Sequence, residues 1–230
     1  MELSIRLKHV YSMADKCNCI ADIGTDHGYI PIELIKNGIC KKVIASDINP
    51  GPVKKARMNI EKEKLQNDIE CRQGSGLRIL RMYEADGVII SGMGGNLIRD
   101  IISEDEDIFK TFKFAVLQPV QNPEAVRKFI YEQGYQILHE DLCIDENKFY
   151  EIIKVRYDCK TSVMDGIYYE VSSNLIAENH PMIKDYIDYK IECYSKISET
   201  IKSKSYYSVL RKNELNSKVM KLKELRKKCH

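Results

Sequence analysis

The stretch Ile20-Ala21-Asp22-Ile23-Gly24-Thr25-Asp26-His27-Gly28-Tyr29-Ile30-Pro31 decides the fold of this chain. Its first residues are apolar and predict a buried strand, its middle is an acidic, glycine-rich turn, and its end opens a helix. Glycines in such a turn let the backbone come close to a ligand, because no Cβ stands in the way. A strand, a glycine turn and a helix in this order predict a ligand site at the edge of a parallel sheet.

The acidic character of the turn indicates the kind of ligand. Asp22-x-Gly24-x-x-x-Gly28 after a strand is a pattern with which many methyltransferases hold S-adenosylmethionine (SAM). A carboxylate suits the cationic amino-acid end of SAM and would repel a pyrophosphate. The dinucleotide fingerprint Gly-x-Gly-x-x-Gly instead aims backbone N–H groups at phosphates. We therefore expect SAM as the cofactor, held by Asp22, Gly24, Thr25 and Gly28, with an NAD enzyme as the alternative.

Apolar, β-rich runs alternate with helical patterns from about residue 20 to residue 157. Strands are expected at Ile20–Ile23, Lys42–Asp47, Ile69–Gln73, Gly87–Ile90, Phe114–Gln118, Tyr135–Ile144 and Tyr150–Tyr157, the last two as an antiparallel pair. Helices are expected at Tyr29–Asn37, Pro52–Glu63, Asn96–Ile102 and Pro123–Gln133. This alternation predicts an α/β fold with a Rossmann-like, doubly wound sheet that binds ligands at the carboxyl ends of its strands.

The character of the sequence changes after about Cys159. The last glycine is Gly166 and the last proline is Pro181, so the residues beyond them contain neither of the two strongest helix breakers. We therefore expect two domains, a Rossmann-like SAM-binding catalytic domain at residues 1–158 and a helical domain at residues 159–230.

The second domain has the spacing of long helices. Apolar residues recur three and four positions apart from Ile183 to Ile201, and again from Leu215 to Leu222. The polar, tyrosine-rich segment Ser203–Ser208 separates the two stripes and is expected to hold a turn. The pattern predicts an antiparallel, coiled-coil-like α-helical hairpin, preceded by a shorter helix near residues 168–177.

Charge is spread unevenly along a chain whose formal net charge is only +2. Ten Lys and Arg side chains fall within residues 201–230, where Glu214 and Glu224 are the opposing acids. A basic tail on a nearly neutral body favours a polyanionic partner such as tRNA, and a solvated helix face is the alternative. The residues expected to contact RNA are Arg6, Lys212, Lys221 and Arg226.

Two further strand ends extend the expected cofactor site. Asp47 closes the second strand, where a carboxylate can accept hydrogen bonds from the ribose hydroxyls of SAM, with Ile48 beside it. A helix N-cap or turn residue is the alternative, although the strand context favours the ribose role, and the spacing from the glycine turn also fits NAD. Gly74, Ser75 and Gly76 follow the third strand, where the adenine ring of SAM is expected. The Ser75 hydroxyl can bond a base, although a plain Gly-Ser-Gly turn accounts for the same residues.

The next two strand ends face the reacting groups in this class of fold. Ser91-Gly92-Met93-Gly94-Gly95 follows the fourth strand, and its glycines would leave space for a planar base beside the sulfonium. Ser91, Gly92 and Met93 are therefore added to the expected cofactor site. Gln118 ends the fifth strand, and its amide could read the edge of a flipped base. A turn with Asn122 as the N-cap of the next helix is the alternative there.

Composition excludes several other classes. No apolar run is long enough to span a bilayer, and the first residues lack the apolar region of a signal peptide, so we expect a cytoplasmic protein without membrane contact. The eight cysteines contain no Cys-x-x-Cys pair and are expected to be reduced. No set of His, Cys and carboxylate residues has the spacing of metal ligands, so no metal is expected.

Taken together, several motifs resemble the TrmK family of bacterial tRNA (adenine-22-N1)-methyltransferases over nearly the whole chain. The matching segments are Leu3–Leu7, Ala21–Pro31, Asn49–Pro52, Ser91–Gly95, Leu117–Pro119 and Glu146–Ile153. The resemblance implies a Rossmann-like SAM domain followed by a helical coiled-coil domain, acting on N1 of adenine 22 in the D-loop region of tRNA. Three positions depart from the usual family residues, namely Thr25 for Ser, Ser75 for Asp and Val120 for Asn.

The implied reaction suggests catalytic roles for four residues. N1 of adenine lies on the Watson–Crick edge, so the target base must be unpaired or swung out of its stack. The methylated base is cationic, and Asp26 is the first candidate to stabilise that charge, with His27 and Tyr29 lining the pocket and Gln118 at the base edge. The alternatives are a methyltransferase with another substrate and a non-catalytic RNA-binding module. The sequence leaves the oligomeric state open, with a monomer favoured.

Overall fold

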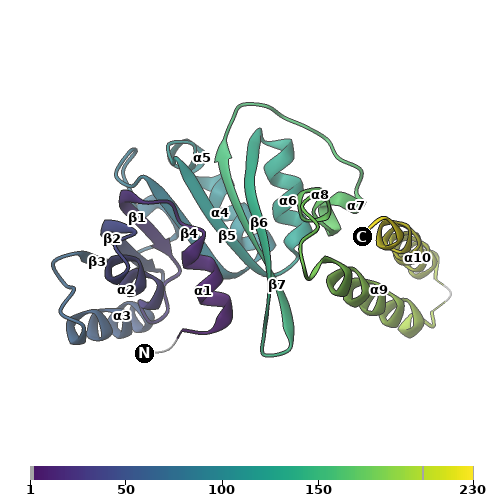
Figure 1. Ribbon diagram of the computed structural model, residues 1–230, viewed down its shortest axis with the longest axis horizontal. Coiled ribbons are helices and arrows are strands. Elements are labelled where there is room, and N and C mark those ends of the chain that lie inside the picture. Colours follow the sequence, from purple (N-terminus) through teal and green to yellow (C-terminus); the bar gives the residue numbers. More distant parts are fainter. Residues whose placement is uncertain (1–2, 204, 230) are drawn as a thin grey trace. The chain divides into compact units, whose positions relative to one another are not determined.

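The computed structural model describes residues 3–203 and 205–229. Contacts between residues divide the chain into two compact units, and the division falls between Val163 and Met164 (Figure 1). Each unit has its own buried side chains, and each is described below by itself.

A seven-stranded sheet forms the centre of the first unit (Figure 1). Its strands are β1 Cys17–Ile23, β2 Cys40–Asp47, β3 Ile69–Gln73, β4 Gly87–Gly94, β5 Phe114–Gln121, β6 Tyr135–Asp145 and β7 Lys148–Tyr157, in the spatial order β3-β2-β1-β4-β5-β7-β6. The first five strands are parallel, and β7 runs antiparallel between β5 and β6. The strand order reverses between β1 and β4, and this is the point at which open α/β sheets bind ligands.

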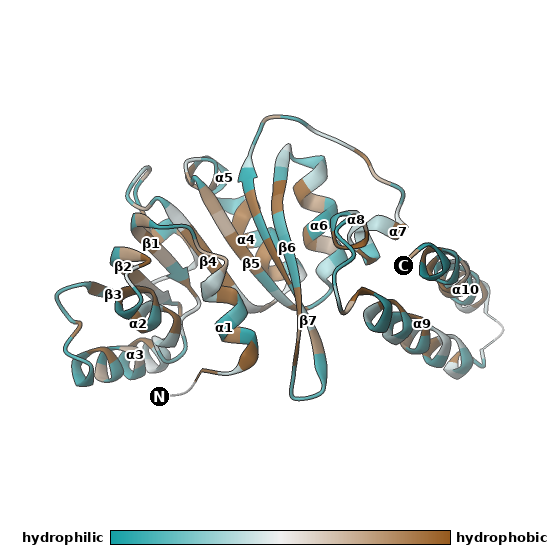
Figure 2. Cartoon of the chain, in the orientation of Figure 1, coloured by the Kyte–Doolittle hydropathy of each residue, from teal (hydrophilic) through white to brown (hydrophobic). Residues whose placement is uncertain are grey.

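Helices cover both faces of this sheet and create two apolar cores. Helices α1 Ile5–Ser12, α2 Tyr29–Lys36 and α3 Pro50–Lys62 pack on one face, and α4 Gly95–Glu104, α5 Glu106–Phe109, α6 Pro123–Glu132 and the short 3-10 helix η1 Gly76–Ile79 pack on the other. Strand β4 supplies both cores, because Val88 and Ile90 point to the second face and Ile89 points to the first. Figure 2 accordingly shows hydrophobic residues along the central strands.

The structure confirms the seven expected strands, and every one except β3 is longer than expected. Strand β1 begins at Cys17 rather than Ile20, and β4 continues through the glycine-rich run to Gly94. Irregular pairing with β5 at Ser91, Met93 and Gly94 bends this last part of β4, so the run is a bulged strand end instead of the expected free turn. Helices α1 and α5 had no counterpart in the sequence analysis.

The expected final pair of antiparallel strands is confirmed and forms a tight hairpin. Glu146 and Asn147 connect β6 to β7 with φ angles of 48° and 61°. Two central residues with positive φ are the mark of a type I′ turn, whose twist matches that of the flanking strands. Because β6 runs in the direction of β5, its last residue, Asp145, lies at the same edge of the sheet as the ends of β1 and β4.

A buried ionic network attaches this hairpin to α6. Arg127 is fully buried, and its guanidinium donates to Glu140 Oε1 of β6 at 2.9 and 2.7 Å and also to Glu151 of β7. Both carboxylates are buried as well. The network therefore connects α6 to both strands of the hairpin away from solvent.

The second unit is helical and contains α7 Ile167–Glu170, α8 Ser173–Ala177, α9 Ile183–Thr200 and α10 Tyr206–Lys228. The single helix expected near residues 168–177 is thus two short helices. Asp188 in the first half of α9 pairs with Arg226 near the end of α10, and Ser198 near the end of α9 bonds Asn216 of α10. Helix α10 therefore runs back along α9, which confirms an antiparallel helix pair.

A charged cluster holds this helix pair to α7. Glu170 is buried at the end of α7 and accepts hydrogen bonds from Lys190 of α9, at 3.3 Å, and from Lys218 of α10, at 2.6 Å. Tyr194 of α9 donates to the same carboxylate. The expected apolar stripe holds for Ile183 and Ile187 but drifts further on, and polar Ser198 is buried near the end of the helix.

Candidate functional site

The turn after β1 has a backbone that requires glycine. Gly24 and Gly28 have φ angles of 81° and 71°, in the left-handed region that residues with a Cβ avoid. The N–H groups of Gly24 and Thr25 donate to the carbonyl of Ser46 at 2.8 and 2.7 Å, which ties the turn to the end of β2. A Cβ at Gly24 would lie 2.0 Å from Cε of Met93. The turn is thus rigid and closely covered.

Asp22 places a carboxyl group in a buried position beneath this turn. Its exposed fraction is only 3%, and the Thr25 side chain hydrogen-bonds to it. Burial raises the pKa of Asp22 to about 7, and the Thr25 hydrogen bond partly opposes this shift. A ligand that brings a positive charge would relieve the cost of ionising this carboxyl group.

Asp22 and the turn form one wall of a cleft of about 450 Å³. The cleft is lined by Ser4, Arg6, Leu7, Asp22, Gly24, Thr25, Asp26, His27, Tyr29, Ile30, Ser91, Gly92, Asp145, Glu146 and Tyr150. Four of these residues are acidic, and the guanidinium of Arg6 is the one Lys or Arg group among them. This lining favours a cationic ligand over an anionic one.

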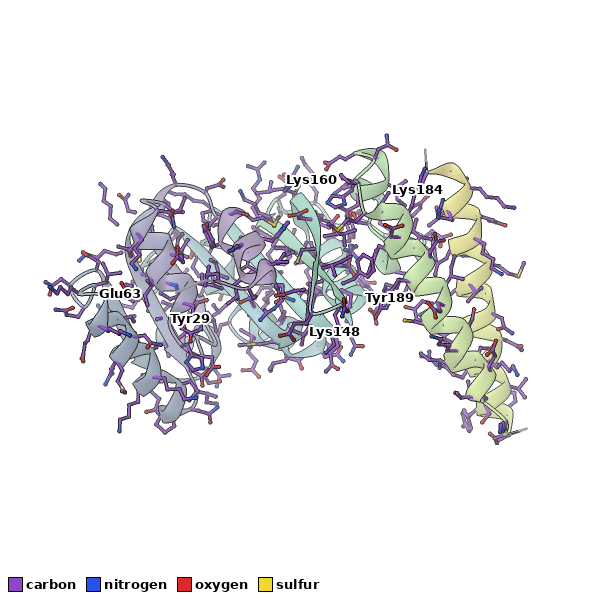
Figure 3. The ribbon with its side chains drawn as sticks, turned by 60° about the horizontal axis from the view of Figure 1, so that its bottom comes forward. Tyr29, Glu63, Lys148, Lys160, Lys184 and Tyr189 are labelled. Atoms are coloured by element: carbon purple, nitrogen blue, oxygen red, sulfur yellow. The ribbon has the colours of Figure 1, made fainter. Side chains whose placement is uncertain are left out.

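A polar and aromatic group at the cleft comes from three residues in and directly after the glycine turn, Asp26, His27 and Tyr29. His27 Nε2 lies 3.1 Å from Asp26 Oδ2, and the His27 ring stacks on that of Tyr29 with centroids 4.9 Å apart. Tyr29 begins α2 and is labelled in Figure 3. The side chain of Asp26 is 67% exposed, so its carboxylate is open to solvent at the cleft. The structure thus brings all three sequence-predicted residues to one place.

Gln118 lies at the end of β5 but does not line the cleft. It is completely buried, and its Oε1 accepts hydrogen bonds from Gly92 N at 3.1 Å and from the Arg6 guanidinium at 2.6 Å. Its Nε2 donates to the carbonyl of Pro119 at 2.8 Å. In this arrangement both ends of the amide are occupied within the protein, and Gln118 supports Gly92 and Arg6 from behind.

The opposite wall comes from two elements that sequence reasoning did not assign to the site. The Arg6 N–H of α1 donates to Asp145 Oδ2 at 3.1 Å, and the Ser4 side chain hydrogen-bonds to the same carboxylate. These contacts hold the pKa of Asp145 below its usual range, and the hydrogen bond from Ser4 has the largest effect. Tyr150 of β7 completes this wall. The matched segment Glu146–Ile153 was the available signal, but its residues were not linked to the cleft.

The remaining sequence-predicted cofactor residues lie along the edge of the sheet, outside the cleft lining. Asp47 Oδ1 accepts a hydrogen bond from Asn49 N at 2.7 Å, and its carbonyl accepts one from Gly74 N at 3.0 Å. Ile48 is 60% exposed. Ser75 precedes η1 without a side-chain capping bond, and Gly76 has a φ of 54°. These residues form a ledge at the ends of β2 and β3.

The predicted RNA contacts of the second unit have different surroundings. Lys212 is exposed on α10. Lys221 pairs with Asp165 at 2.9 Å, and Arg226 pairs with Asp188 at 2.9 Å. Two of the three cations are thus already paired within their own unit, although exposed pairs of this kind exchange easily with solvent and ions.

Within residues 3–203 and 205–229, no three His, Cys, Asp or Glu side chains gather so that they could hold a metal ion. The eight cysteines are free thiols. In the described part of the chain, no helix combines the length and the apolar character needed to cross a membrane.

The chain is similar to characterised and structurally solved proteins over most of its length. A family model described as TrmK, tRNA (adenine(22)-N(1))-methyltransferase, matches residues 20–224. The tRNA (adenine(22)-N(1))-methyltransferase of Bacillus subtilis is 32% identical over 167 residues, which cover 73% of this chain and 70% of that protein.

Solved structures agree with this match. The crystal structure of the B. subtilis m1A22 tRNA methyltransferase TrmK is 27% identical, with a TM-score of 0.87 and coverage of 98% of this chain and 99% of that one. A Streptococcus pneumoniae protein described as a candidate tRNA (m1A22) methyltransferase was solved in complex with S-adenosyl-L-methionine. It is 26% identical to this chain, with a TM-score of 0.83, and the match covers 98% of this chain and 100% of that one.

The sheet order, the acid-lined cleft at the switch point and these matches agree with one another. The chain therefore belongs to the TrmK family of tRNA (adenine(22)-N(1))-methyltransferases.

Proposed function

We propose that the cleft between the turn after β1 and the wall formed by α1 and the β6–β7 hairpin is the place of methyl transfer. Enzymes of this family methylate N1 of adenine 22 in tRNA with SAM as the donor, and so does this chain. The observation that carries the proposal is the buried carboxyl group of Asp22 in an acid-lined cleft. A cationic donor and a cationic product fit this lining, whereas a phosphate-rich cofactor would be repelled.

The residues present fit SAM along the whole edge of the sheet. Asp22 and Thr25 would hold the ammonium and carboxylate end, with Gly24 and Gly28 giving the backbone its close approach. Asp47 and Ile48 would contact the ribose, and the ledge of Gly74, Ser75 and Gly76 would contact the adenine ring. Ser91, Gly92 and Met93 would lie along the reactive end. When bound, SAM supplies an electrophilic methyl group on a sulfonium.

The chain's own task in the reaction is alignment. Neutral adenine N1 already carries an in-plane lone pair, so no base has to remove a proton before attack. The protein must hold N1 in line with the methyl group and exclude water. Asp26 is placed to stabilise the positive charge that develops on the base, and His27 and Tyr29 offer planar surfaces beside it.

A paired binding and activity experiment tests this assignment. Asp22→Asn keeps the size of the side chain but removes its charge, so SAM affinity measured by calorimetry should fall at least tenfold. Methylation of a tRNA transcript with adenine at position 22 should fall with it, while a transcript with guanine at that position should stay unmodified by the wild type. Normal SAM affinity in Asp22→Asn would contradict the assignment of this cleft as the SAM site.

We propose that the helix pair of the second unit contacts the tRNA. We also propose that the two helices form a coiled coil, in which their apolar stripes pack against each other. Lys212 is exposed on α10, and Lys221 and Arg226 carry further charge along the helix. The neighbouring Tyr206 and Tyr207 are 73% and 81% exposed, and exposed aromatic rings among basic residues are typical of RNA-binding surfaces.

We further propose that a catalytic domain at residues 1–158 and a helical domain at residues 159–230 act as separate domains within a monomer. The protein would work in the cytoplasm, where its substrate tRNA is found. Analytical ultracentrifugation of the full chain, alone and with tRNA, tests the monomer, and a stable dimer without tRNA would contradict it.

A further inference from the structure

Arg6 is held inside the cleft in a fixed orientation. It is half-buried, and its NH1 donates to Gln118 Oε1 at 2.6 Å. Its Cζ lies 5.5 Å from the centroid of the Tyr150 ring, on the face of that ring. Its backbone N–H is bonded to Asp145. Two separate strands, β5 and β7, thus contact this guanidinium, and a third, β6, holds the backbone of Arg6.

The charges around Arg6 do not suit a phosphate contact. Asp22, Asp26, Asp145 and Glu146 line the same cleft. A phosphate that approached Arg6 there would meet these carboxylates, and like charges at short range repel strongly in a partly desolvated site. The phosphate-binding role that the sequence suggested for Arg6 is therefore poorly matched to its surroundings.

A role for Gln118 in reading the base is also poorly matched to the structure. Its amide oxygen already accepts two hydrogen bonds, and its amide nitrogen donates to Pro119. Gln118 instead holds the Arg6 guanidinium and the Gly92 N–H on one oxygen atom, at 2.6 and 3.1 Å. A buried amide with this pattern acts as a positioning residue, since it holds the guanidinium of one neighbour and the backbone N–H of another.

We propose that the Arg6 guanidinium is a stacking surface for the target adenine. Guanidinium planes stack on purine rings, and a base swung out of a helix needs such a surface. The Arg6 guanidinium is held by its hydrogen bond to Gln118 and lies over the face of the Tyr150 ring, and the stacked His27–Tyr29 pair lines the same cleft. This inference rests on the proposed function and names the group that holds its substrate base.

The chemistry of the product agrees with this arrangement. The unmodified adenine is neutral and stacks on a cation without repulsion. The N1-methylated base is cationic, so Arg6 repels it once the methyl group has moved. The four carboxylates that line the cleft partly offset this repulsion while the methyl group is transferred. Arg6 therefore favours the substrate base over the product base.

The substitution Arg6→Lys separates the contribution of the planar guanidinium group from that of its positive charge. Lysine keeps the positive charge and can still donate to Gln118, but it has no planar group. We expect Arg6→Lys and Arg6→Ala each to lower kcat/KM for tRNA by roughly 10- to 100-fold, the range of one base-stacking contact. The matched control is Lys8→Ala, which removes a cation from the same helix outside the cleft lining and should retain wild-type kcat/KM.

Two further measurements separate stacking from other roles. The salt dependence of tRNA affinity should be unchanged in Arg6→Lys and Arg6→Ala, whereas the loss of a phosphate contact would lower its slope by about one. 2-Aminopurine at position 22 of the tRNA is quenched by its neighbouring bases and brightens when it is swung out of its stack. Stacking on the guanidinium should limit this gain, so the complex with the wild type should be dimmer than the complex with Arg6→Lys.

Each other result overturns the inference. Wild-type activity in Arg6→Lys, with a loss only in Arg6→Ala, would make Arg6 a charge contact. Normal activity in Arg6→Ala would remove it from substrate binding altogether. A lower melting temperature or weaker SAM affinity in both variants would make it a structural residue. Failure of the proposed function itself would appear in the wild type, as absence of SAM binding or of adenine methylation.

Discussion

Asp22 shows how the fold changes the chemistry of one residue. The same carboxyl group would be ionised in the unfolded chain at neutral pH, but burial at the end of β1 raises its pKa to about 7. Between roughly pH 4 and pH 7 the native chain therefore holds a proton that the unfolded chain has released. From this group alone, stability falls as pH rises through that window and levels off above it, by roughly 4 kcal/mol in total.

The raised pKa of Asp22 makes the stability of the wild type depend on pH. Without SAM, the wild type should lose stability between pH 5 and pH 8 relative to Asp22→Asn, as measured by urea unfolding at both pH values. SAM should raise the melting temperature of the wild type more at pH 8 than at pH 5, because an ionised Asp22 pairs with its ammonium group. Glu61→Gln, a change at an exposed carboxylate, is the control. Equal pH dependence in all three proteins would contradict the assigned burial effect.

The glycine at position 24 can be tested against another glycine with a similar backbone. Gly24→Ala places a Cβ at a φ of 81° and against Met93, while Gly38→Ala places one at a φ of 63° in open space. Both should lose about 1–2 kcal/mol of stability from backbone strain. Only Gly24→Ala should weaken SAM binding, measured by calorimetry. Equal SAM affinity in the two variants would show that the turn does not contact the cofactor.

At the scale of elements, the β6–β7 hairpin depends on α6 for its position. Arg127→Ala would leave Glu140 and Glu151 without their buried guanidinium, and breaking a buried pair in this way costs about 3–5 kcal/mol. We expect a large fall in melting temperature and a loss of methylation, because Asp145 and Tyr150 sit on this hairpin. Lys128→Ala on the same helix breaks only an exposed pair with Glu132 and should change little. A stable, active Arg127→Ala enzyme would contradict this.

The basic face of α10 gives a prediction about RNA. The triple change Lys212→Ala, Lys223→Ala and Lys227→Ala removes three exposed cations and should lower the slope of tRNA affinity against salt by up to about three. The matched control removes three exposed lysines of α3, by changing Lys54, Lys55 and Lys62 to Ala. SAM affinity should be unaffected in both. An equal loss of tRNA affinity in the two triple variants would show that tRNA binding depends on the overall charge of the protein and not on the face of α10.

At the scale of the molecule, the division between Val163 and Met164 predicts an independent first unit. Both apolar cores of the sheet are completed by residues before this point. A chain of residues 1–163 should fold cooperatively and bind SAM within about twofold of the full protein, yet methylate tRNA poorly. Circular dichroism, calorimetry and nucleoside analysis check these three outcomes. Aggregation of this fragment would mean that the first unit cannot stand alone.

Much of the architecture was accessible from local patterns. Each central strand is a short apolar run, so the βαβ order and the hairpin pair were found, and family membership agrees with the motif resemblance. Because the chain belongs to this family, the SAM methyltransferase is favoured over the two alternatives, an NAD enzyme and a non-catalytic RNA-binding module. Helix α1 was missed because its eight residues carry only Val10 as a fully buried apolar position, which is too weak a stripe to recognise.

The candidate site was predictable where one turn supplies it. Asp22, Gly24 and Thr25 follow each other in the chain, and the structure finds them together in the cleft. Ser4, Asp145 and Tyr150 could not be assigned, since nothing local in a sequence tells which distant segments meet. The roles expected of Arg6 and Gln118 were drawn from residue type, whereas the hydrogen bond between these two side chains decides what each can contact.

The link between Arg6 and Asp145 has a consequence for how the enzyme comes into being. The two residues are 139 positions apart, and one emerges from the ribosome long before the other. The cleft therefore acquires its second wall only when nearly the entire first unit has been synthesised. A nascent chain that ends before the hairpin would possess the glycine turn without the wall that the proposed base binding requires, so we expect unfinished copies to transfer no methyl group to tRNA.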